Sequence, residues 1–455
     1  MTVIDRSVLA RRLASEEQRF IETHPKAAAV AAGGSSLLAG VPMAWMTRWP
    51  GAFPIIVDEA SGARFVDIDG HSYVDFCLGD TGAMTGHGLA QVADAIERQA
   101  RRGITTMLPS PDAAWVGDEL ARRFGLASWQ MAMTATDANR FVLRFARHLT
   151  GRPKVLVFNW CYHGTVDETF AVLDDQGRVV TRPGTIGSPV PVSDTTKVVE
   201  FNDLDALEAA LAPGDVAAVL AEPALTNIGI VLPDPGYHEA LREICDRTGT
   251  LLVIDETHTL CVGPGGATRE WDLRPDFFVI GKAIAGGVPA AAYGMSAEIA
   301  ERLGPVLGDH TIDTAGVGGT LTGNALALAA IRATLSSTLR GEDFARMIPL
   351  AQAWSDGVQS VIDGAGLAWS VNRLGCRSEY WFCPPPRNGR DAAAAVDEDL
   401  EAYLHLHALN RGVLLTPFHN MALMSPAHTA SDVEAHTAAF REAVDALVEP
   451  RSAEG

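Results

Sequence analysis

The chain has 455 residues and a formal net charge of −20, which argues against a nucleic-acid partner because a polyanion is repelled by an acidic surface. Hydrophobic residues make up 47% of the sequence and charged residues 20%, as in a globular protein of two or three domains. The six cysteines are scattered without a Cys-x-x-Cys pair, which predicts reduced thiols and a cytoplasmic location. We expect neither a signal peptide nor a membrane span, because the apolar runs are too short.

The N-terminal part predicts a helix followed by a long loop. Residues 1–32 have the spacing of an amphipathic helix, which ends at two glycines. The stretch 35–54 is rich in Gly, Pro and Trp and has no clear periodicity, which indicates a long ordered loop of the kind that often carries function. Trp45 and Arg48 are candidate substrate contacts in this loop; the alternative is that its tryptophans fill the core beneath it.

Three short strands come next, and helices then alternate with strands. The short strands are separated by Ser-Gly and Asp-Gly turns and cover residues 55–58, 64–67 and 72–76. The helices predicted after them are 89–101, 114–124, 137–149, 204–211 and 237–248, and the strands are 155–158, 217–221, 251–254 and 277–280. This alternation predicts a mostly parallel sheet with helices on both faces, whose ligands bind beyond the carboxyl ends of the strands.

Helices dominate the C-terminal part, which reads as a smaller α+β domain. The predicted helices are 325–339, 343–362, 396–410 and 432–447, and the strand-like segments are 375–383 and 413–416. The predicted organisation has three parts. Residues 1–75 join the small domain, residues 76–330 form a large cofactor-binding domain, and residues 331–455 form the C-terminal small domain.

Three predicted strands end in ionisable side chains, which are Glu222, Asp255 and Lys282. A lysine buried at a strand end loses its charge easily, and its neutral amine can form a Schiff base with a carbonyl group. The alternative is a lysine that points into solvent. Asp255 is suited to pair with a protonated pyridine nitrogen, or else to cap a helix or bind Arg269 or Arg274.

Two segments have the small residues and hydroxyl groups that bind phosphate at a helix N-terminus. Thr134, Ala135 and Thr136 open one predicted helix, and Thr320 lies in a glycine-rich loop before another; an ordinary N-cap and a flexible turn are the alternatives. Tyr162 follows a strand and either stacks on a flat cofactor or packs in the core.

Several other cofactors are disfavoured by the sequence. It lacks the glycine fingerprint of nicotinamide enzymes and the Gly-Lys-Ser/Thr motif of nucleoside triphosphate enzymes. His163 and His258 are candidate hydrogen-bond partners near the strand ends. No His, Cys or carboxylate cluster has the spacing of metal ligands along the sequence, so no metal is predicted.

In their order, these motifs resemble those of the class III pyridoxal-phosphate-dependent aminotransferases, and within them the group of glutamate-1-semialdehyde aminomutases and β-amino-acid aminotransferases. The resemblance covers residues 33–447 and rests on the segments WCYHG, AEPALTNIGI, VIDETHT, VIGKAIAGGVPAAAYG and GGTLTGN. It implies an α/β protein of fold type I, with a mostly parallel seven-stranded sheet in the large domain and a smaller α+β domain. It also implies a homodimer with shared active sites.

The resemblance implies a role for each matched residue. Lys282 would hold pyridoxal 5'-phosphate as a Schiff base and then move the substrate proton, and Asp255 would pair with the pyridine nitrogen. Glu222 would lie near the cofactor hydroxyl and the substrate. The remaining implied contacts are Tyr162 and Thr257 on the two faces of the ring, Thr134, Ala135 and Thr136 around the phosphate, and Thr320 reaching the phosphate of the neighbouring subunit.

Some positions depart from the family pattern, and these limit what is implied about the substrate. Ala135 stands where glycine is usual, and His258 replaces Met or Gln. The arginines that bind the substrate carboxylate in the β-amino-acid enzymes are missing, which leaves Arg48, Arg377 and His419 as candidate substitutes. Their absence argues against glutamate-1-semialdehyde as the substrate.

The predicted activity is that of an aminotransferase. It would pass an amino group from an amino acid or amine to a keto or aldehyde acceptor, both small molecules. The alternative is an intramolecular isomerase on the same fold, either an aminomutase or an amino-acid racemase. The two readings differ in whether a second substrate receives the amino group.

Overall fold

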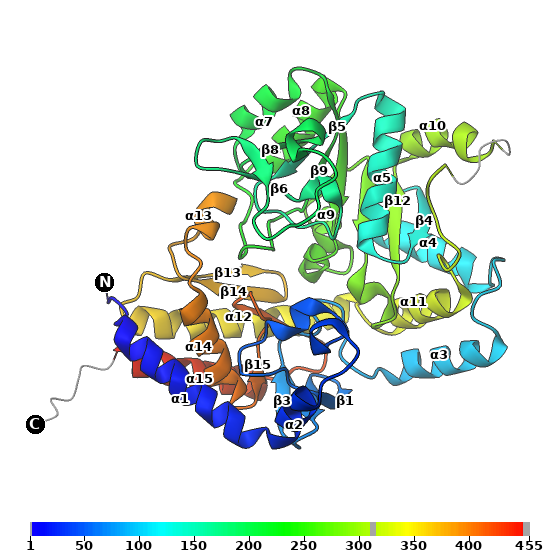
Figure 1. The fold of residues 1–455 in the computed structure, drawn as a ribbon. Coiled ribbons are helices and arrows are strands. Elements are labelled where there is room, and N and C mark those ends of the chain that lie inside the picture. The colour runs from blue at the N-terminus through cyan, green and yellow to red at the C-terminus, as the bar shows by residue number, and fades with distance from the viewer. Residues whose placement is uncertain (1, 310–314, 449–455) are drawn as a thin grey trace, which may run out of the picture. The chain divides into compact units, whose positions relative to one another are not determined.

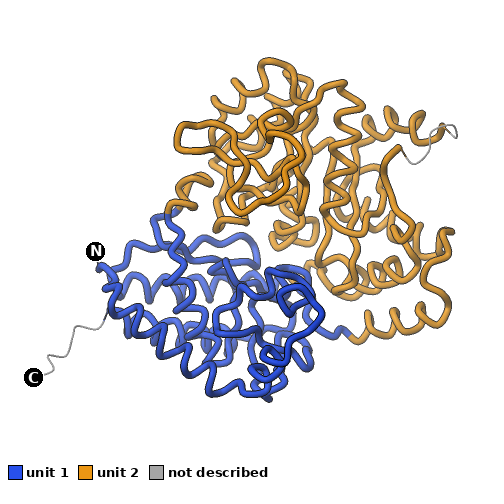
Figure 2. Tube along the Cα trace, viewed as in Figure 1, with its two compact units in different colours: residues 1–89, 345–385, 395–455 blue, residues 90–344, 386–394 orange. Residues whose placement is uncertain are grey.

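The computed structural model describes residues 2–309 and 315–448. The chain forms two compact units (Figure 2). Unit 1 comprises residues 1–89, 345–385 and 395–455, and unit 2 comprises residues 90–344 and 386–394. The three-part division at residues 75 and 330 stays a prediction. None of the described helices is long and apolar enough to cross a membrane.

Unit 2 is built around a seven-stranded sheet (Figure 1). In spatial order its strands are β4 (Ser128–Ala132), β12 (Ala291–Met295), β11 (Phe277–Ile280), β10 (Leu251–Asp255), β9 (Val216–Ala221), β5 (Lys154–Phe158) and β8 (Thr196–Val199). All run parallel except β12, which is antiparallel to both of its neighbours. The prediction of a mostly parallel seven-stranded sheet is therefore confirmed.

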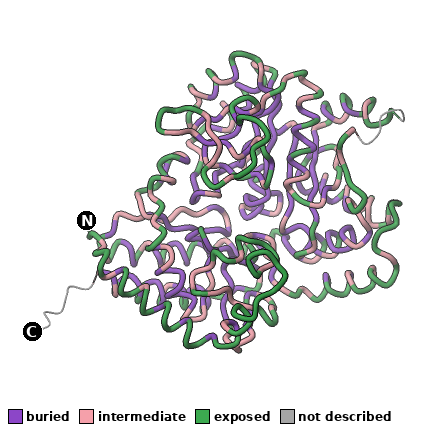
Figure 3. The backbone as a smooth tube through the Cα atoms, viewed as in Figure 1, coloured by how far each residue is buried: buried purple, intermediate pink, exposed green. Residues whose placement is uncertain are grey.

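Helices cover this sheet because its central strands have no polar face. Every residue of β9, β10 and β11 is buried (Figure 3), as expected for continuous apolar runs in a parallel sheet. The helices of unit 2 are α3 (Ala90–Arg102), α4 (Asp112–Phe124), α5 (Ala135–Thr150), α6 (Val192–Thr195), α7 (Leu204–Leu211), α8 (Tyr237–Thr248), α9 (Gly266–Glu270), α10 (Ala297–Leu307), α11 (Ala325–Ser337) and α13 (Gly389–Ala393). A small hairpin, β6 (Ala171–Leu173) and β7 (Val179–Thr181), follows β5.

Unit 1 holds two smaller sheets and the long helices of the chain ends. One sheet is β1 (Val57–Ser61), β2 (Arg64–Asp67), β3 (Ser72–Asp75) and β15 (Val413–Leu414), and the other is β13 (Ser370–Leu374), β14 (Arg377–Trp381) and β16 (Met421–Leu423). The helices are α1 (Arg6–Thr23), α2 (Pro25–Gly33), α14 (Glu398–Leu409), α15 (Ala430–Val448) and, from Ala345 onward, α12 (Gly341–Gly364). This mixture fits the predicted α+β character.

Two expectations for the N-terminal segment are wrong in detail. Residues 1–32 do not form one helix, because α1 ends at Thr23 and α2 begins at Pro25, whose missing N–H group suits the first turn of a new helix. The segment 35–54 is not loop throughout, since it contains the short 3-10 helices η1 (Leu38–Gly40) and η2 (Ala44–Thr47).

Candidate active site

The strand-end residues of unit 2 meet at one edge of its sheet. Strands β11, β10, β9 and β5 are consecutive and parallel, so their carboxyl ends lie on the same side. Lys282, Asp255, Glu222 and Tyr162 stand at or just beyond these four ends. This is the edge at which ligands bind in open α/β sheets.

Lys282 begins a short 3-10 helix, η5 (Lys282–Ala285), after β11. Its φ of 50° is left-handed, a conformation that costs a non-glycine residue about 1–2 kcal/mol. Its amine Nζ lies 2.8 Å from Nε2 of His258, which precedes η4 (Thr259–Val262). Backbone strain of this kind gathers at functional sites, where surrounding packing enforces it.

Asp255 is a buried carboxylate with several hydrogen bonds. Its Oδ2 accepts from Asn139 Nδ2 at 2.8 Å and lies 3.0 Å from His163 Nδ1, and its Oδ1 accepts from the Thr257 hydroxyl at 2.6 Å. Burial alone would raise the pKa of Asp255, but the bonds from His163, Thr257 and Asn139 outweigh it and hold the pKa below the ordinary value. A buried carboxylate that stays ionised is suited to a cationic nitrogen.

The contacts of Asp255 exclude one alternative raised for it. They are made to His163, Asn139 and Thr257 among the described residues, so the salt bridge to Arg269 or Arg274 is not formed. His163 is fixed as the hydrogen-bond partner that the sequence suggested.

The N-terminus of α5 packs against this cluster through glycines. A Cβ atom on Gly281 would lie 3.2 Å from that of Ala135, and one on Gly164 would lie 2.1 Å from Thr136 Oγ1. Thr134 is the N-cap, since its hydroxyl accepts from the backbone N–H of Asp137 at 3.1 Å. Free N–H groups at this helix start therefore lie beside the segment that carries Lys282, where they are suited to a phosphate.

Tyr162 and Glu222 lie close together at the ends of β5 and β9. The Tyr162 side chain is 37% exposed, so it does not pack in the core, and its backbone N–H donates to Glu222 at 3.4 Å. Glu222 also accepts from the hydroxyl of Thr226. Burial raises the pKa of Glu222, which favours its protonated form more than in solution.

Sequence analysis did not identify two residues that lie near the site. Asn139 lies one helical turn after Ala135, so spacing puts the two on one face of α5, but packing alone turns that face toward Asp255. Arg182 follows β7, and it donates to the Cys161 carbonyl at 3.2 Å with its guanidinium 5.2 Å from the Trp160 ring centre. No motif marked Arg182, because the hairpin fold alone brings it back to the end of β5.

The other predicted residues are placed as follows. Thr320 is exposed, in the loop before α11. Trp45 and Arg48 are exposed in unit 1, and the Trp45 ring is 6.3 Å from that of Phe418. His419 is buried with its Nδ1 3.3 Å from Glu379. Their roles toward substrate or cofactor stay predictions.

Arg377, offered as a substitute carboxylate ligand, lies inside β14. It is fully buried, and its guanidinium donates to Glu379 at 3.3 Å. A guanidinium that is buried and already paired within its own unit is a poor candidate for a substrate contact.

Comparison with known proteins identifies the family. Residues 45–444 match the class III aminotransferases. The chain is 33% identical to a glutamate-1-semialdehyde 2,1-aminomutase of Sorangium cellulosum over 88% of this chain and 91% of the relative. A glutamate-1-semialdehyde aminomutase structure from Pseudomonas aeruginosa PAO1 is 52% identical, with a TM-score of 0.96 over 98% of this chain and 99% of that one. An ω-transaminase from Sphaerobacter thermophilus is 27% identical, with a TM-score of 0.85 over 93% and 99%.

The residues of unit 2 fit the cofactor of this family. A variant of the Pseudomonas aeruginosa protein was solved in complex with PMP, the amino form of pyridoxal phosphate. Here Asp255 is ionised beside Asn139, and Gly164 and Gly281 leave no side chain between the start of α5 and the Lys282 segment. The chain therefore belongs to the class III aminotransferase family of fold type I enzymes, whose cofactor is pyridoxal phosphate.

Proposed function

We propose that this chain is an intramolecular aminomutase, which moves an amino group between two positions of one small substrate. Lys282 carries the proton-transfer part of the proposal, because its amine lies 2.8 Å from His258 Nε2 at the strand edge. The relatives named above support isomerisation more than the aminotransferase reading that the sequence pattern favoured.

The proposal assigns a chemical role to each of three residues of the site. When bound, pyridoxal phosphate draws electrons from the carbon that carries the amino group and makes its proton acidic. Lys282 Nζ takes this proton and returns it at the second position, and His258 at 2.8 Å exchanges protons with the amine. Asp255, whose pKa is lowered, would pair as a carboxylate with the protonated ring nitrogen of the cofactor.

The remaining residues hold and orient the bound molecules. The start of α5, from Thr134 to Thr136, holds the phosphate through its free backbone N–H groups. The exposed ring of Tyr162 offers a flat surface for stacking. Arg182 is the cation we assign to a substrate carboxylate, because the β6–β7 hairpin brings its guanidinium beside Trp160 and Cys161 at the end of β5.

An aminotransferase is the second candidate. The family match and the resemblance to the ω-transaminase and to a β-phenylalanine aminotransferase of Variovorax paradoxus, at 26% identity and a TM-score of 0.84, favour it. In that case the amino group would leave on the cofactor and pass to a second substrate. The residues of the site would be the same.

We further propose a cytoplasmic homodimer in which Thr320 of each subunit reaches the phosphate bound by the other. Thr320 is exposed, and the described cysteines are all free thiols, which suits a reducing compartment. The acidic surface gives no basis for nucleic-acid binding.

The first experiment tests Lys282. Borohydride treatment of protein loaded with pyridoxal phosphate should fix the cofactor on one peptide, and mass spectrometry should locate it at Lys282. The Lys282→Ala variant should give no modified peptide at this position. Wild-type protein without a modified Lys282 would remove the basis of the proposal.

The second experiment separates isomerisation from transfer. The enzyme is incubated with one amino compound at a time and no acceptor, beginning with glutamate-1-semialdehyde and continuing with α-, β- and ω-amino acids. Continued turnover to an isomer that keeps its amino group supports the aminomutase, and with glutamate-1-semialdehyde this isomer is an amino ketone. One product per active site that has lost its amino group, followed by arrest, supports the aminotransferase instead.

A further inference from the structure

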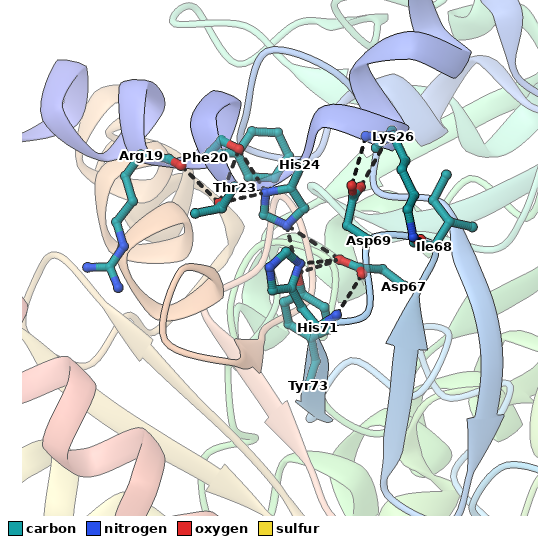
Figure 4. A network of polar contacts seen from close by, with 11 residues as sticks. Arg19, Phe20, Thr23, His24, Lys26, Asp67, Ile68, Asp69, His71 and Tyr73 are labelled. Carbon is teal, nitrogen blue, oxygen red and sulfur yellow. Dashed lines mark hydrogen bonds and ion pairs between the residues drawn. The ribbon is translucent and has the colours of Figure 1, made fainter.

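Three side chains with metal-binding atoms converge in unit 1, which does not contain Lys282 (Figure 4). His24 joins α1 to α2, Asp67 ends β2, and His71 precedes β3. His24 Nε2 lies 3.4 Å from Asp67 Oδ2, and His71 Nδ1 lies 3.1 Å from the same oxygen. The two imidazole ring centres are 4.6 Å apart.

The orientation of His24 is fixed by a hydrogen bond on its far side. Nδ1 lies 2.7 Å from the Phe20 carbonyl oxygen, and because a carbonyl only accepts, this nitrogen carries a proton. In neutral imidazole Nε2 then presents its lone pair toward Asp67 and the Tyr73 hydroxyl. Metal-binding histidines commonly have this arrangement, in which a backbone carbonyl holds the other ring nitrogen.

The Tyr73 hydroxyl adds a fourth polar atom to this group. It lies 2.8 Å from Asp67 Oδ2 and 2.8 Å from His24 Nε2. Asp67 and His24 are nearly buried, with side chains 1% and 3% exposed, so bulk water has little access to them. A cation bound among these atoms would be held by lone pairs from both residues.

We propose that His24 Nε2, Asp67 Oδ2 and His71 Nδ1 bind one divalent ion of the zinc class. Zinc binds nitrogen and carboxylate ligands at about 2.0–2.1 Å in a tetrahedron, whose ligand atoms are then about 3.4 Å apart. The separations of 3.4 and 3.1 Å match that edge within the movement of a side chain. The Tyr73 hydroxyl or a solvent molecule takes the fourth position.

The ligand set and its surroundings favour zinc over other common ions. Two imidazoles and one carboxylate suit zinc, whereas magnesium and calcium prefer oxygen ligands alone. The ion enters from the His71 side, because that side chain is 40% exposed while Asp67 and His24 are nearly buried. Binding moves the Nδ1 proton of His71 to its Nε2.

The ion would fasten the joint between the first two helices to the turn before β3. The same turn already holds the start of α2, since Asp69 accepts from the backbone N–H groups of Lys26 at 2.8 Å and Ala27 at 3.0 Å. The sequence predicted no metal because His24 lies far along the chain from Asp67 and His71. Only the fold brings the three ligands together, so that prediction is revised here.

The test is a zinc titration of the full-length, cofactor-loaded protein after treatment with a chelator. Equilibrium dialysis with elemental analysis should give one zinc per chain, and zinc should raise the melting temperature. The His71→Gln variant, at a partly exposed position, should bind zinc at least about tenfold more weakly. Asp67→Asn, which keeps the side-chain shape, should do the same. His87→Gln is the matched control, because His87 pairs with one carboxylate, Asp75, at 2.7 Å outside the cluster.

Two results would overturn the proposal. One is wild-type protein that binds no more zinc than His71→Gln. The other is a cobalt complex whose spectrum shows thiolate charge transfer, because the ion would then lie on cysteines. Cobalt spectra typical of tetrahedral nitrogen and oxygen ligands, lost in His71→Gln and kept in His87→Gln, support it. Cofactor loading is measured on the same samples, so failure of the proposed enzyme activity would not be mistaken for failure of the zinc site.

Discussion

Replacing Gly164 by alanine tests whether the start of α5 holds the cofactor's phosphate. Gly164 has a φ of 75°, and an added Cβ would lie 2.1 Å from Thr136 Oγ1. The left-handed backbone costs alanine about 1–2 kcal/mol. The clash turns the Thr136 hydroxyl away and breaks the bond that it accepts from the Thr165 N–H at 3.0 Å, which costs about 1 kcal/mol more.

Gly151→Ala is the control for this substitution. Gly151 has a φ of 69°, and no atom lies within 4 Å of a Cβ placed there, so only the backbone cost applies. Urea unfolding of the cofactor-free proteins should show a loss of about 1–2 kcal/mol for Gly151→Ala and about 2–3 kcal/mol for Gly164→Ala. Pyridoxal phosphate titration should show about tenfold weaker binding for Gly164→Ala alone. This corresponds to a loss of about 1.4 kcal/mol in binding free energy. Equal cofactor affinity in both variants would refute a contribution of the Thr136 side chain to phosphate binding.

Three further predictions concern buried charges. His258→Asn should lower the rate about 10²- to 10⁴-fold and alter its pH profile while cofactor loading stays unchanged, because Lys282 loses its proton partner; a wild-type rate would contradict this. Asn139→Leu should cost about 1.5–3 kcal/mol in urea unfolding at pH 7, because ionised Asp255 loses a donor. Since the pKa of Asp255 is lowered in the folded protein, this difference should shrink as the pH falls through that pKa, and a constant difference would argue against the assignment. Burial and nearby carboxylates raise the pKa of Glu401 from 4.5 to about 7. The contribution of Glu401 to the free energy of unfolding should therefore fall by about 3 kcal/mol as the pH rises from 4.5 to 7. Glu401→Gln should therefore match wild type near pH 4 and exceed it at pH 8, and parallel pH profiles would disprove this.

The central sheet could be predicted where its strands are continuous apolar runs. The strands predicted at 217–221, 251–254 and 277–280 agree with β9, β10 and β11 to within one residue at each end. Three other strands of this sheet, β4, β8 and β12, were missed. The sequences of β4 and β12, SWQMA and AAYGM, are not rich in β-branched residues, and they are strands because each pairs along its length with a neighbour in the sheet.

Some residues of the candidate site could be located from the sequence, and others could not. Lys282, Asp255 and Glu222 could be located because parallel strands carry their last residues to one edge. The contact from Asn139 depends on which face α5 turns inward, and the position of Arg182 depends on a hairpin. Single-sequence patterns leave both of these undetermined, since they are set by tertiary packing.

The left-handed backbone of Lys282 has a consequence for protein engineering. At a φ of 50° glycine would be less strained than lysine, so a stabilisation screen without selection for activity should favour Lys282→Gly. The more stable variant would then be one that has lost the amine to which we assign the proton transfer. This chain carries a lysine there at that cost in folding free energy, so thermostability designs that start from it need the position held fixed to keep the role proposed for Lys282.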